Sequence, residues 1–174
     1  MTLKLLLTGR PRVGKTTVIR KVIAALGERA GGFCTEEARD ESGQRIGFRI
    51  ITLTGERGWL ARLGSKEKYC LGRYGVDVEE LERLGVSAVR EALAEREVVV
   101  IDEIGPMEMF SPAFRQVVLG ALASPKALLA TIVARPHPFA DRVKCAPGVR
   151  MITVTPENRD ELPVAVVEML GEAE

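Results

Sequence analysis

Two groups of residues in this sequence have types and spacing suited to phosphate chemistry. The first is the run GRPRVGKT at residues 9–16, which fits the pattern G-x-x-x-x-G-K-[ST]. In that pattern the backbone N–H groups of the loop and the start of the next helix face a β-phosphate. Lys15 adds a positive charge beside the β and γ oxygens, and Thr16 offers a hydroxyl to Mg²⁺. The spacing therefore predicts binding of a nucleoside triphosphate together with Mg²⁺.

The second group is the pair Asp102-Glu103, which follows the apolar run Val98–Ile101. A buried strand that ends in Asp places a carboxylate at the C-terminal edge of a parallel sheet, where α/β folds bind ligands. We expect Asp102 to hold Mg²⁺ together with Thr16. Glu103 is placed to accept a hydrogen bond from a water in line with the γ-phosphate, so Lys15 and Glu103 are the candidate catalytic residues. The alternative is that the acidic pair only ends the strand and begins a solvated loop.

Hydrophobic periodicity predicts the elements that would position these groups. The run before the glycine loop favours a buried strand at Leu3–Thr8, and the run after it favours a helix at Thr16–Leu26 that ends at Gly27. Further strands are expected at Ala30–Thr35, Val98–Ile101, Ala127–Val133 and Gly148–Val154, and further helices from Asp77 to about Arg96, from Ser111 to about Ala123, and after Pro163. This alternation predicts five parallel strands with helices on both faces, a three-layer α/β fold.

One stretch departs from that alternation. From about Phe33 to Leu63, turn signals flank a partly alternating run, which predicts a small antiparallel insertion or sheet edge. The glycine-rich stretch Tyr69–Gly75 is expected to be a loop, acting as a lid or packing on the sheet edge. His137 lies between two prolines and is also expected in a loop.

Length and composition limit the classes of protein. With 174 residues and 46% hydrophobic content, the chain should form a single domain over residues 1–174. The 25 Lys and Arg against 24 Asp and Glu give a net charge of +1, so nucleic acid is an unlikely partner unless a local basic patch exists. No leader or apolar run of roughly 20 residues indicates a membrane protein, and we expect a soluble cytoplasmic one. Three isolated cysteines do not indicate a disulfide framework or zinc site.

Five blocks of the sequence together resemble a known family: residues 9–16, 32–37, 47–49, 102–110 and 155–160. They are similar to the small stand-alone P-loop nucleoside triphosphatases first known from thermophiles, the family that includes the human cancer-related nucleoside triphosphatase. The resemblance implies a RecA-like domain that slowly hydrolyses several nucleoside triphosphates with Mg²⁺. It implies nucleotide contacts from Gly9, Arg10, Pro11, Arg12, Val13, Gly14, Lys15, Thr16 and Thr17, and from Val100, Ile101, Asp102, Glu103, Ile104 and Gly105. Relatives commonly carry Lys after this last glycine, whereas this chain has Pro106.

Several questions stay open at this level. No Asn-Lys-x-Asp tetrapeptide is present, which fits tolerance of ATP, GTP, CTP and UTP. Asn158 and Arg159 could lie near the base, and Asn158 could equally cap a helix. Arginines that could neutralise the transition state are Arg12, Arg135, Arg142 and Arg159. A small-molecule or nucleotide kinase, and a slow switch acting with an RNA or protein partner, are the alternative functions. The sequence does not determine the oligomeric state, and a monomer is slightly favoured.

Overall fold

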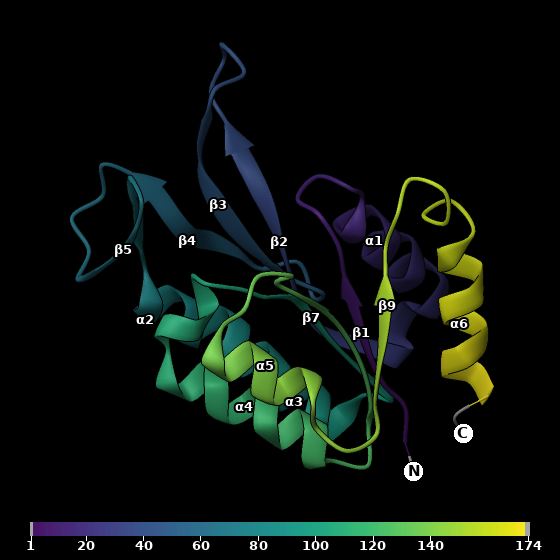
Figure 1. Ribbon diagram of the computed structural model, residues 1–174. Coiled ribbons are helices and arrows are strands. Elements are labelled where there is room, and N and C mark those ends of the chain that lie inside the picture. Colours follow the sequence, from purple (N-terminus) through teal and green to yellow (C-terminus); the bar gives the residue numbers. More distant parts are fainter. Residues whose placement is uncertain (1, 173–174) are drawn as a thin grey trace.

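Nine strands form one mixed sheet in this computed structural model, which describes residues 2–172 (Figure 1). Their spatial order is β5-β6-β4-β3-β2-β7-β8-β1-β9. The strands are β1 (Lys4–Thr8), β2 (Ala30–Arg39), β3 (Arg45–Thr52), β4 (Arg57–Leu63), β5 (Tyr69–Leu71), β6 (Tyr74–Val76), β7 (Val98–Ile104), β8 (Ala127–Ile132) and β9 (Val149–Thr153). Strands β2, β7, β8, β1 and β9 are parallel, which confirms the five predicted parallel strands.

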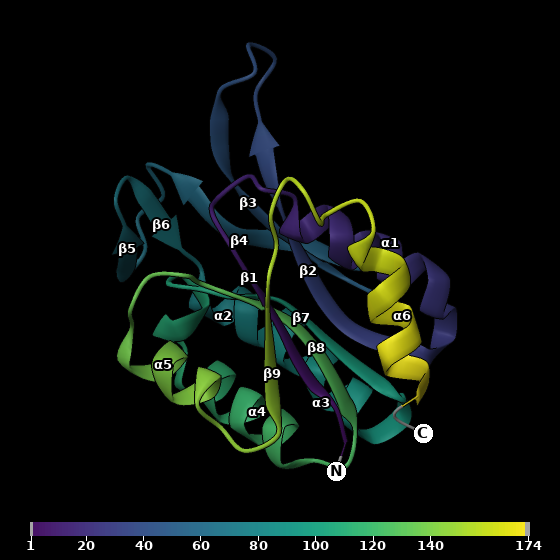
Figure 2. The same cartoon turned by 45° about the vertical axis from the view of Figure 1, so that its right-hand side comes forward.

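Helices cover both faces of the parallel part of the sheet. The helical elements are α1 (Lys15–Leu26), η1 (Gly27–Arg29), α2 (Val78–Glu80), η2 (Leu81–Val86), α3 (Ser87–Glu95), η3 (Glu108–Phe110), α4 (Pro112–Ala123), α5 (Pro138–Lys144) and α6 (Leu162–Glu172). Figures 1 and 2 show α1 and α6 on one side of the sheet and α3, α4 and α5 on the other. The three-layer α/β prediction is therefore confirmed.

Strand β1, which pairs with β8 on one side and with β9 on the other, shows why two cores form. Successive side chains of a strand point to opposite faces of the sheet. Leu5 and Leu7 are fully buried in the cluster that includes residues of α1 and α6, whereas Leu6 belongs to the cluster formed with α3 and α4. A run that is apolar at every position is what a strand covered on both faces requires.

The antiparallel part of the sheet also follows the prediction, with one correction. Strands β3 and β4 extend the sheet beyond β2 as expected. The stretch Tyr69–Gly75, however, is not a loop: β5 and β6 form a hairpin that turns at Gly72, with φ of 58°, and β6 pairs with β4. A Cβ on Gly75 would lie 2.3 Å from the carbonyl oxygen of Ser65, so this glycine allows close packing on the sheet edge. The segment therefore packs against the edge rather than forming a lid.

His137 lies in a loop, as predicted, but the helix that follows it was not predicted. Helix α5 begins at Pro138, and Nδ1 of His137 accepts a hydrogen bond of 3.1 Å from the Phe139 N–H. Proline fits the first position of a helix because its missing N–H would have no partner there. The helix is held by Phe139, Ala140 and Val143, all buried. This histidine thus has a structural role at a helix start.

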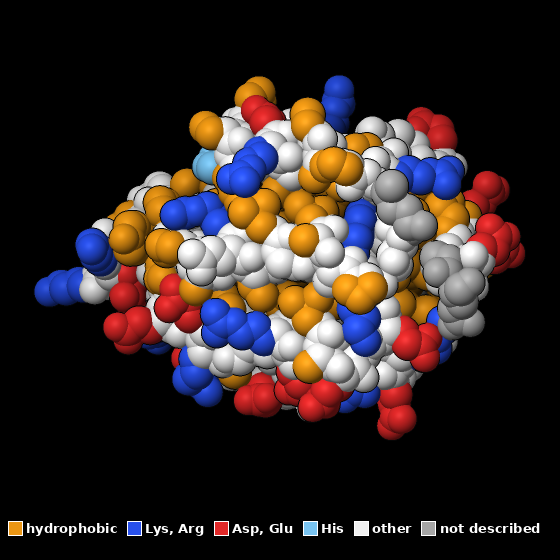
Figure 3. Space-filling model, turned by 90° about the horizontal axis from the view of Figure 1, so that it is seen from below, with side chains coloured by type: hydrophobic (Ala, Val, Ile, Leu, Met, Phe, Trp, Pro, Cys, Tyr) orange, Lys and Arg blue, Asp and Glu red, His pale blue; other side chains and the backbone are white. Residues whose placement is uncertain are grey.

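Figure 3 shows the face that is lowest in Figure 1, where hydrophobic side chains alternate with charged groups of both signs. Among residues 2–172, no helix has the length and apolar character needed to cross a membrane.

Candidate nucleotide site

The glycine loop joins β1 to α1 and adopts a conformation that most side chains would prevent. Gly9 has φ of 149°, and a Cβ there would lie 2.8 Å from the carbonyl oxygen of Val154. Gly14, with φ of 112°, is the residue before α1. These backbone angles are accessible to glycine without strain, which explains both positions. The loop therefore presents its backbone and the positive end of α1 to a ligand at the C-terminal edge of the sheet.

Lys15 connects this loop to the end of β7. Its Nζ donates a 2.9 Å hydrogen bond to the carbonyl oxygen of Gly9 and lies 4.0 Å from Oε2 of Glu103. Its side chain is only 13% exposed. The ammonium group of Lys15 is thus held between the phosphate loop and the proposed catalytic carboxylate. In this position it could contact the β- and γ-phosphates of a bound triphosphate.

Asp102 is the most constrained carboxylate at the site. It is 2% exposed, and its Oδ1 accepts hydrogen bonds from the hydroxyls of Thr131 at 2.7 Å and Thr16 at 3.5 Å. Its Oδ2 is buried without a partner among the described residues. Burial raises the pKa of Asp102 to about 6, because the charged form loses water. A buried carboxylate oxygen without a partner, beside a threonine hydroxyl, fits the oxygen ligands that Mg²⁺ prefers.

A second carboxyl group, that of Glu108, lies close to Glu103 at the turn after β7. A Cβ on Gly105 would lie 2.4 Å from Oε1 of Glu103 and 2.9 Å from Oε2 of Glu108, so a larger residue would force these carboxyl groups to move. Burial raises the pKa of Glu103 despite the opposing effect of Lys15. Glu108 is 4% exposed, and burial together with the nearby Glu103 charge raises its pKa well above the ordinary value. The turn after β7 therefore carries a half-buried carboxyl, that of Glu103, and a fully buried one, that of Glu108.

The segment before α6 closes one side of the loop. Nη1 of Arg159 donates a 3.2 Å hydrogen bond to the carbonyl oxygen of Val13. Beside it is a small cavity of about 130 Å³ lined by Gly14, Thr17, Val18, Lys21, Arg159 and Asp160. Asn158 makes hydrogen bonds of 2.8 Å and 2.9 Å with the Thr155 N–H and the Thr153 carbonyl oxygen, so its amide stabilises the turn that leads into α6.

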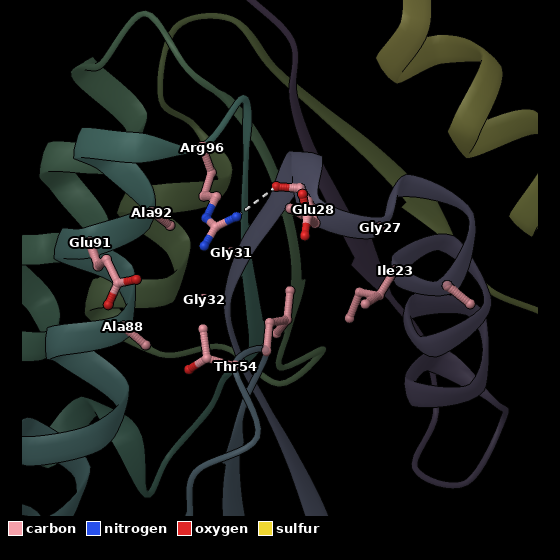
Figure 4. Close-up of a pocket in the computed structure, with 13 residues that line it drawn as sticks. Ile23, Gly27, Glu28, Gly31, Gly32, Thr54, Ala88, Glu91, Ala92 and Arg96 are labelled. Carbon is pink, nitrogen blue, oxygen red and sulfur yellow. Dashed lines mark hydrogen bonds between the residues drawn. The ribbon is translucent and has the colours of Figure 1, made fainter.

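Two further cavities bear on where a ligand binds. One of about 340 Å³ begins at Thr16 and is lined by Arg20, Thr35, Glu36, Glu37 and Phe48. Another, of about 420 Å³, lies between α1 and α3 at the opposite, N-terminal end of β2, where Arg96 donates to the carbonyl oxygen of Glu28 (Figure 4). Its floor is Gly31 and Gly32, and its walls lack the phosphate loop and the strand-end carboxylates. The larger cavity is thus separate from the phosphate-binding features.

The structure groups some predicted site residues and separates others. Thr16, Lys15, Asp102, Glu103 and Gly105 come together at one edge of the sheet. In the loop, Val13 is buried and supports it, whereas Arg10, Pro11, Arg12 and Thr17 are exposed. The side chains of Val100, Ile101 and Ile104 are fully buried in the two hydrophobic cores, which makes them supports of the site. Arg135 and Arg142 are exposed beyond the end of β8.

Sequence reasoning missed two members of this site. Thr131 is the fully buried hydroxyl that bonds Asp102, and its signal was a polar residue inside the apolar strand β8. Glu108 gave no signal of burial, because a carboxylate between methionines in a loop is ordinarily exposed.

A glycine loop entering the first helix of a parallel sheet, with an aspartate at the end of a strand nearby, is the arrangement that defines P-loop nucleotide-binding proteins. This protein has that arrangement, and its fold places it in the P-loop class.

Comparison with known proteins narrows the class to a family. A family model described as NTPase matches residues 4–167. The chain is 45% identical over 168 residues to the nucleoside-triphosphatase THEP1 of Thermotoga petrophila, covering 97% of this chain and 93% of that protein. It is 47% identical over 165 residues to the THEP1 of Thermofilum pendens, covering 91% and 90%. The chain belongs to this NTPase family, as its sequence blocks indicated.

Solved structures agree with this membership. The crystal structure of THEP1 from Aquifex aeolicus aligns with a TM-score of 0.88 at 39% identity, covering 97% of this chain and 99% of that one. The solution structure of a human cancer-related nucleoside triphosphatase aligns with a TM-score of 0.85 at 37% identity, covering 99% of both chains. The likeness thus extends over the whole fold.

Proposed function

We propose that this protein hydrolyses nucleoside 5'-triphosphates to the diphosphate and phosphate in a reaction that depends on Mg²⁺. The observation that carries the proposal is the meeting of three groups at one edge of the sheet: the ammonium of Lys15, the carboxylate of Glu103 4.0 Å away, and the buried Asp102 oxygen, which has no partner within residues 2–172. The names of its relatives, which are nucleoside triphosphatases, support the same reaction class.

In the proposed reaction each group has a defined role. Backbone N–H groups of residues 9–16 and the Lys15 ammonium bind the β- and γ-phosphates and balance the charge that develops between them. Asp102 and Thr16 would hold Mg²⁺, which neutralises phosphate charge when bound. Glu103 accepts a hydrogen bond from the attacking water and takes its proton as the new P–O bond forms and the bond to the diphosphate breaks.

The pKa shift of Glu103 bears on this role. Burial raises the pKa of its carboxyl, and a general base works best when its pKa lies nearer the working pH. The ammonium of Lys15 acts in the opposite direction and keeps the group ionised. The two effects together favour a carboxylate that is charged yet basic enough to accept a proton.

We further infer broad tolerance of the base. The cavity at Thr17, Lys21, Arg159 and Asp160 adjoins the loop on the side away from Asp102, so it is a place for the ribose and base. At about 130 Å³ it is smaller than the pockets of roughly 300 Å³ or more that enclose a ligand. A base would therefore lie largely outside it, where the protein makes few contacts that distinguish purines from pyrimidines.

The decisive experiment measures phosphate release from the purified protein with ATP, GTP, CTP and UTP, with and without Mg²⁺. We expect release from all four with Mg²⁺ and almost none after chelation. Lys15→Ala should weaken both nucleotide binding and turnover, and serves as the control for a contaminating phosphatase. A kinase would instead transfer the phosphoryl group to an added acceptor. If no free phosphate forms when the acceptor is omitted, the proposal is overturned.

A further inference from the structure

The outer face of the antiparallel strands carries a cluster of arginines around the single tryptophan. Strand pairing places Arg49 opposite Trp59. The guanidinium carbon of Arg49 lies 4.4 Å from the centre of the Trp59 ring, and that of Arg62 lies 5.4 Å from it. The ring lies against Gly47, where a Cβ would be 3.0 Å from its Cζ3. Gly47 thus leaves room for the indole ring beside the two guanidinium groups.

This cluster is positively charged and partly open to solvent. Arg62 is exposed, and Arg49 and Trp59 are half-buried. Neither Arg49 nor Arg62 has an ion-pair partner among residues 2–172. Two more arginines share one acid: Arg20 and Arg57 lie 3.1 Å and 3.6 Å from Glu36. We call the five residues Arg20, Arg49, Arg57, Trp59 and Arg62 the arginine–tryptophan surface. With Glu36 included, its four arginines and one acid leave a net charge of +3.

No helix packs over the arginine–tryptophan surface within the part of the chain that the structure describes; the opposite face of β3 and β4 is the one that packs on a helix. Ile50 and Leu60, on the other face of β3 and β4, are buried against Leu81 and Leu84 of η2. In Figures 1 and 2, α1 lies over the parallel strands, and β3 and β4 extend away from it. The mixed charges of the lower face in Figure 3 contrast with the net positive charge of this cluster.

The arginine–tryptophan surface continues from the nucleotide site. Residues paired across antiparallel strands share a face, so Glu36, Arg49 and Trp59 form a row across β2, β3 and β4. Glu36 and Arg20 also line the cavity that begins at Thr16. A chain lying along this row would end beside the proposed magnesium site.

We propose that the arginine–tryptophan surface binds single-stranded nucleic acid. Arginines contribute charge for phosphates, and guanidinium planes and aromatic rings stack on unpaired bases without a strong sequence preference. A polypeptide partner would need an acidic segment, and nothing on this face selects a peptide backbone, because β3 and β4 are each paired on both edges. The binding is additional to triphosphate hydrolysis and does not rest on it.

The test uses the full-length protein with a fluorescein-labelled single-stranded oligoribonucleotide of about 12 nucleotides, a length within the range bound by one domain. Saturating non-hydrolysable triphosphate and Mg²⁺ are present, so that the phosphate loop is filled. Anisotropy of the label reports binding, and fluorescence of the only tryptophan reports contact with this surface. We expect quenching of Trp59. Raising salt from about 50 to about 150 mM should weaken binding about tenfold, as release of counterions from three phosphates requires.

Matched variants separate this surface from general charge. Arg49→Gln with Arg62→Gln should weaken binding at least tenfold and flatten the salt dependence, because two charges are lost. Arg90→Gln with Arg150→Gln removes the same charge from exposed positions on α3 and β9 and should leave binding unchanged. Arg49→Lys with Arg62→Lys retains the charge and should retain the salt dependence, yet bind more weakly because lysine lacks a plane that stacks.

Four results would overturn the proposal: no quenching of Trp59, an equal loss in the α3 and β9 control, oligonucleotide binding that occurs only when the triphosphate analogue is omitted, or equal competition by inorganic polyphosphate. The last would show that the surface binds polyanions without contacting bases. Circular dichroism of each variant, compared with the parent, separates a binding defect from unfolding.

Discussion

Replacing Glu103 by Gln tests the proposed mechanism most directly. The substitution keeps the size and shape of the side chain and removes its charge and its ability to take a proton. General-base catalysis is worth roughly 10²–10⁴-fold in rate, so we expect kcat to fall by at least about 100-fold.

Triphosphate affinity, unlike kcat, should not fall in this variant. The size of the change in affinity follows from the distance between Glu103 and Lys15. At 4.0 Å the attraction between Glu103 and Lys15 would be about 4 kcal/mol at an effective dielectric constant near 20. The Glu103 side chain is 32% exposed, so solvent screening reduces this to roughly 1 kcal/mol. Losing that negative charge leaves Lys15 free for phosphate, and the dissociation constant of the triphosphate should be unchanged or up to about fivefold lower.

Two measurements check the prediction. Phosphate release gives kcat, and equilibrium binding of a fluorescent triphosphate analogue with Mg²⁺ gives affinity. A 100-fold loss of kcat with equal or tighter binding supports a proton acceptor at Glu103. If kcat stays within a fewfold of the parent, water activation by Glu103 is wrong. If binding and kcat fall together, Glu103 is instead a nucleotide-binding or structural residue.

Three further predictions follow from the contacts around Asp102 and Gly105. Thr131→Val removes the 2.7 Å hydrogen bond to Asp102 without changing shape, so the Mg²⁺ concentration for half-maximal turnover should rise about 10-fold or more, and an unchanged titration would contradict the assignment. Gly105→Ala places a methyl 2.4 Å from Oε1 of Glu103; kcat should drop about 100-fold while a fluorescent analogue still binds, and normal turnover would refute the crowding argument. Glu108→Gln removes a carboxyl with a raised folded-state pKa. Above pH about 4.3 the unfolded state releases a proton that the folded state keeps, so parental stability falls as pH rises toward the folded pKa. Relative to its parent, Glu108→Gln should thus gain up to about 1.4 kcal/mol per pH unit in urea unfolding, and parallel pH curves would show that Glu108 is ionised when folded.

Local pattern was sufficient to predict most of the fold and to locate the candidate nucleotide site. The glycine loop of residues 9–16 could be placed between β1 and α1 because the patterns typical of a strand, a loop and a helix follow one another directly in the sequence. The strand before Asp102 could be recognised because a strand buried on both faces is apolar at every position. Both signals are local, so no tertiary information was needed.

Only the tertiary structure placed residues that are distant in the sequence against one another. Thr131 bonds Asp102 because β8 pairs with β7, and Glu108 shares the space at Gly105 with Glu103 because the chain turns back after β7. Arg49 and Arg62 meet at Trp59 through the register of β3 and β4, which single-sequence periodicity does not determine. The sequence by itself thus determined which groups are candidates for binding a triphosphate, since loop and strand ends are local features. Strand order and register decided which side chains surround them, because these depend on packing across the whole sheet.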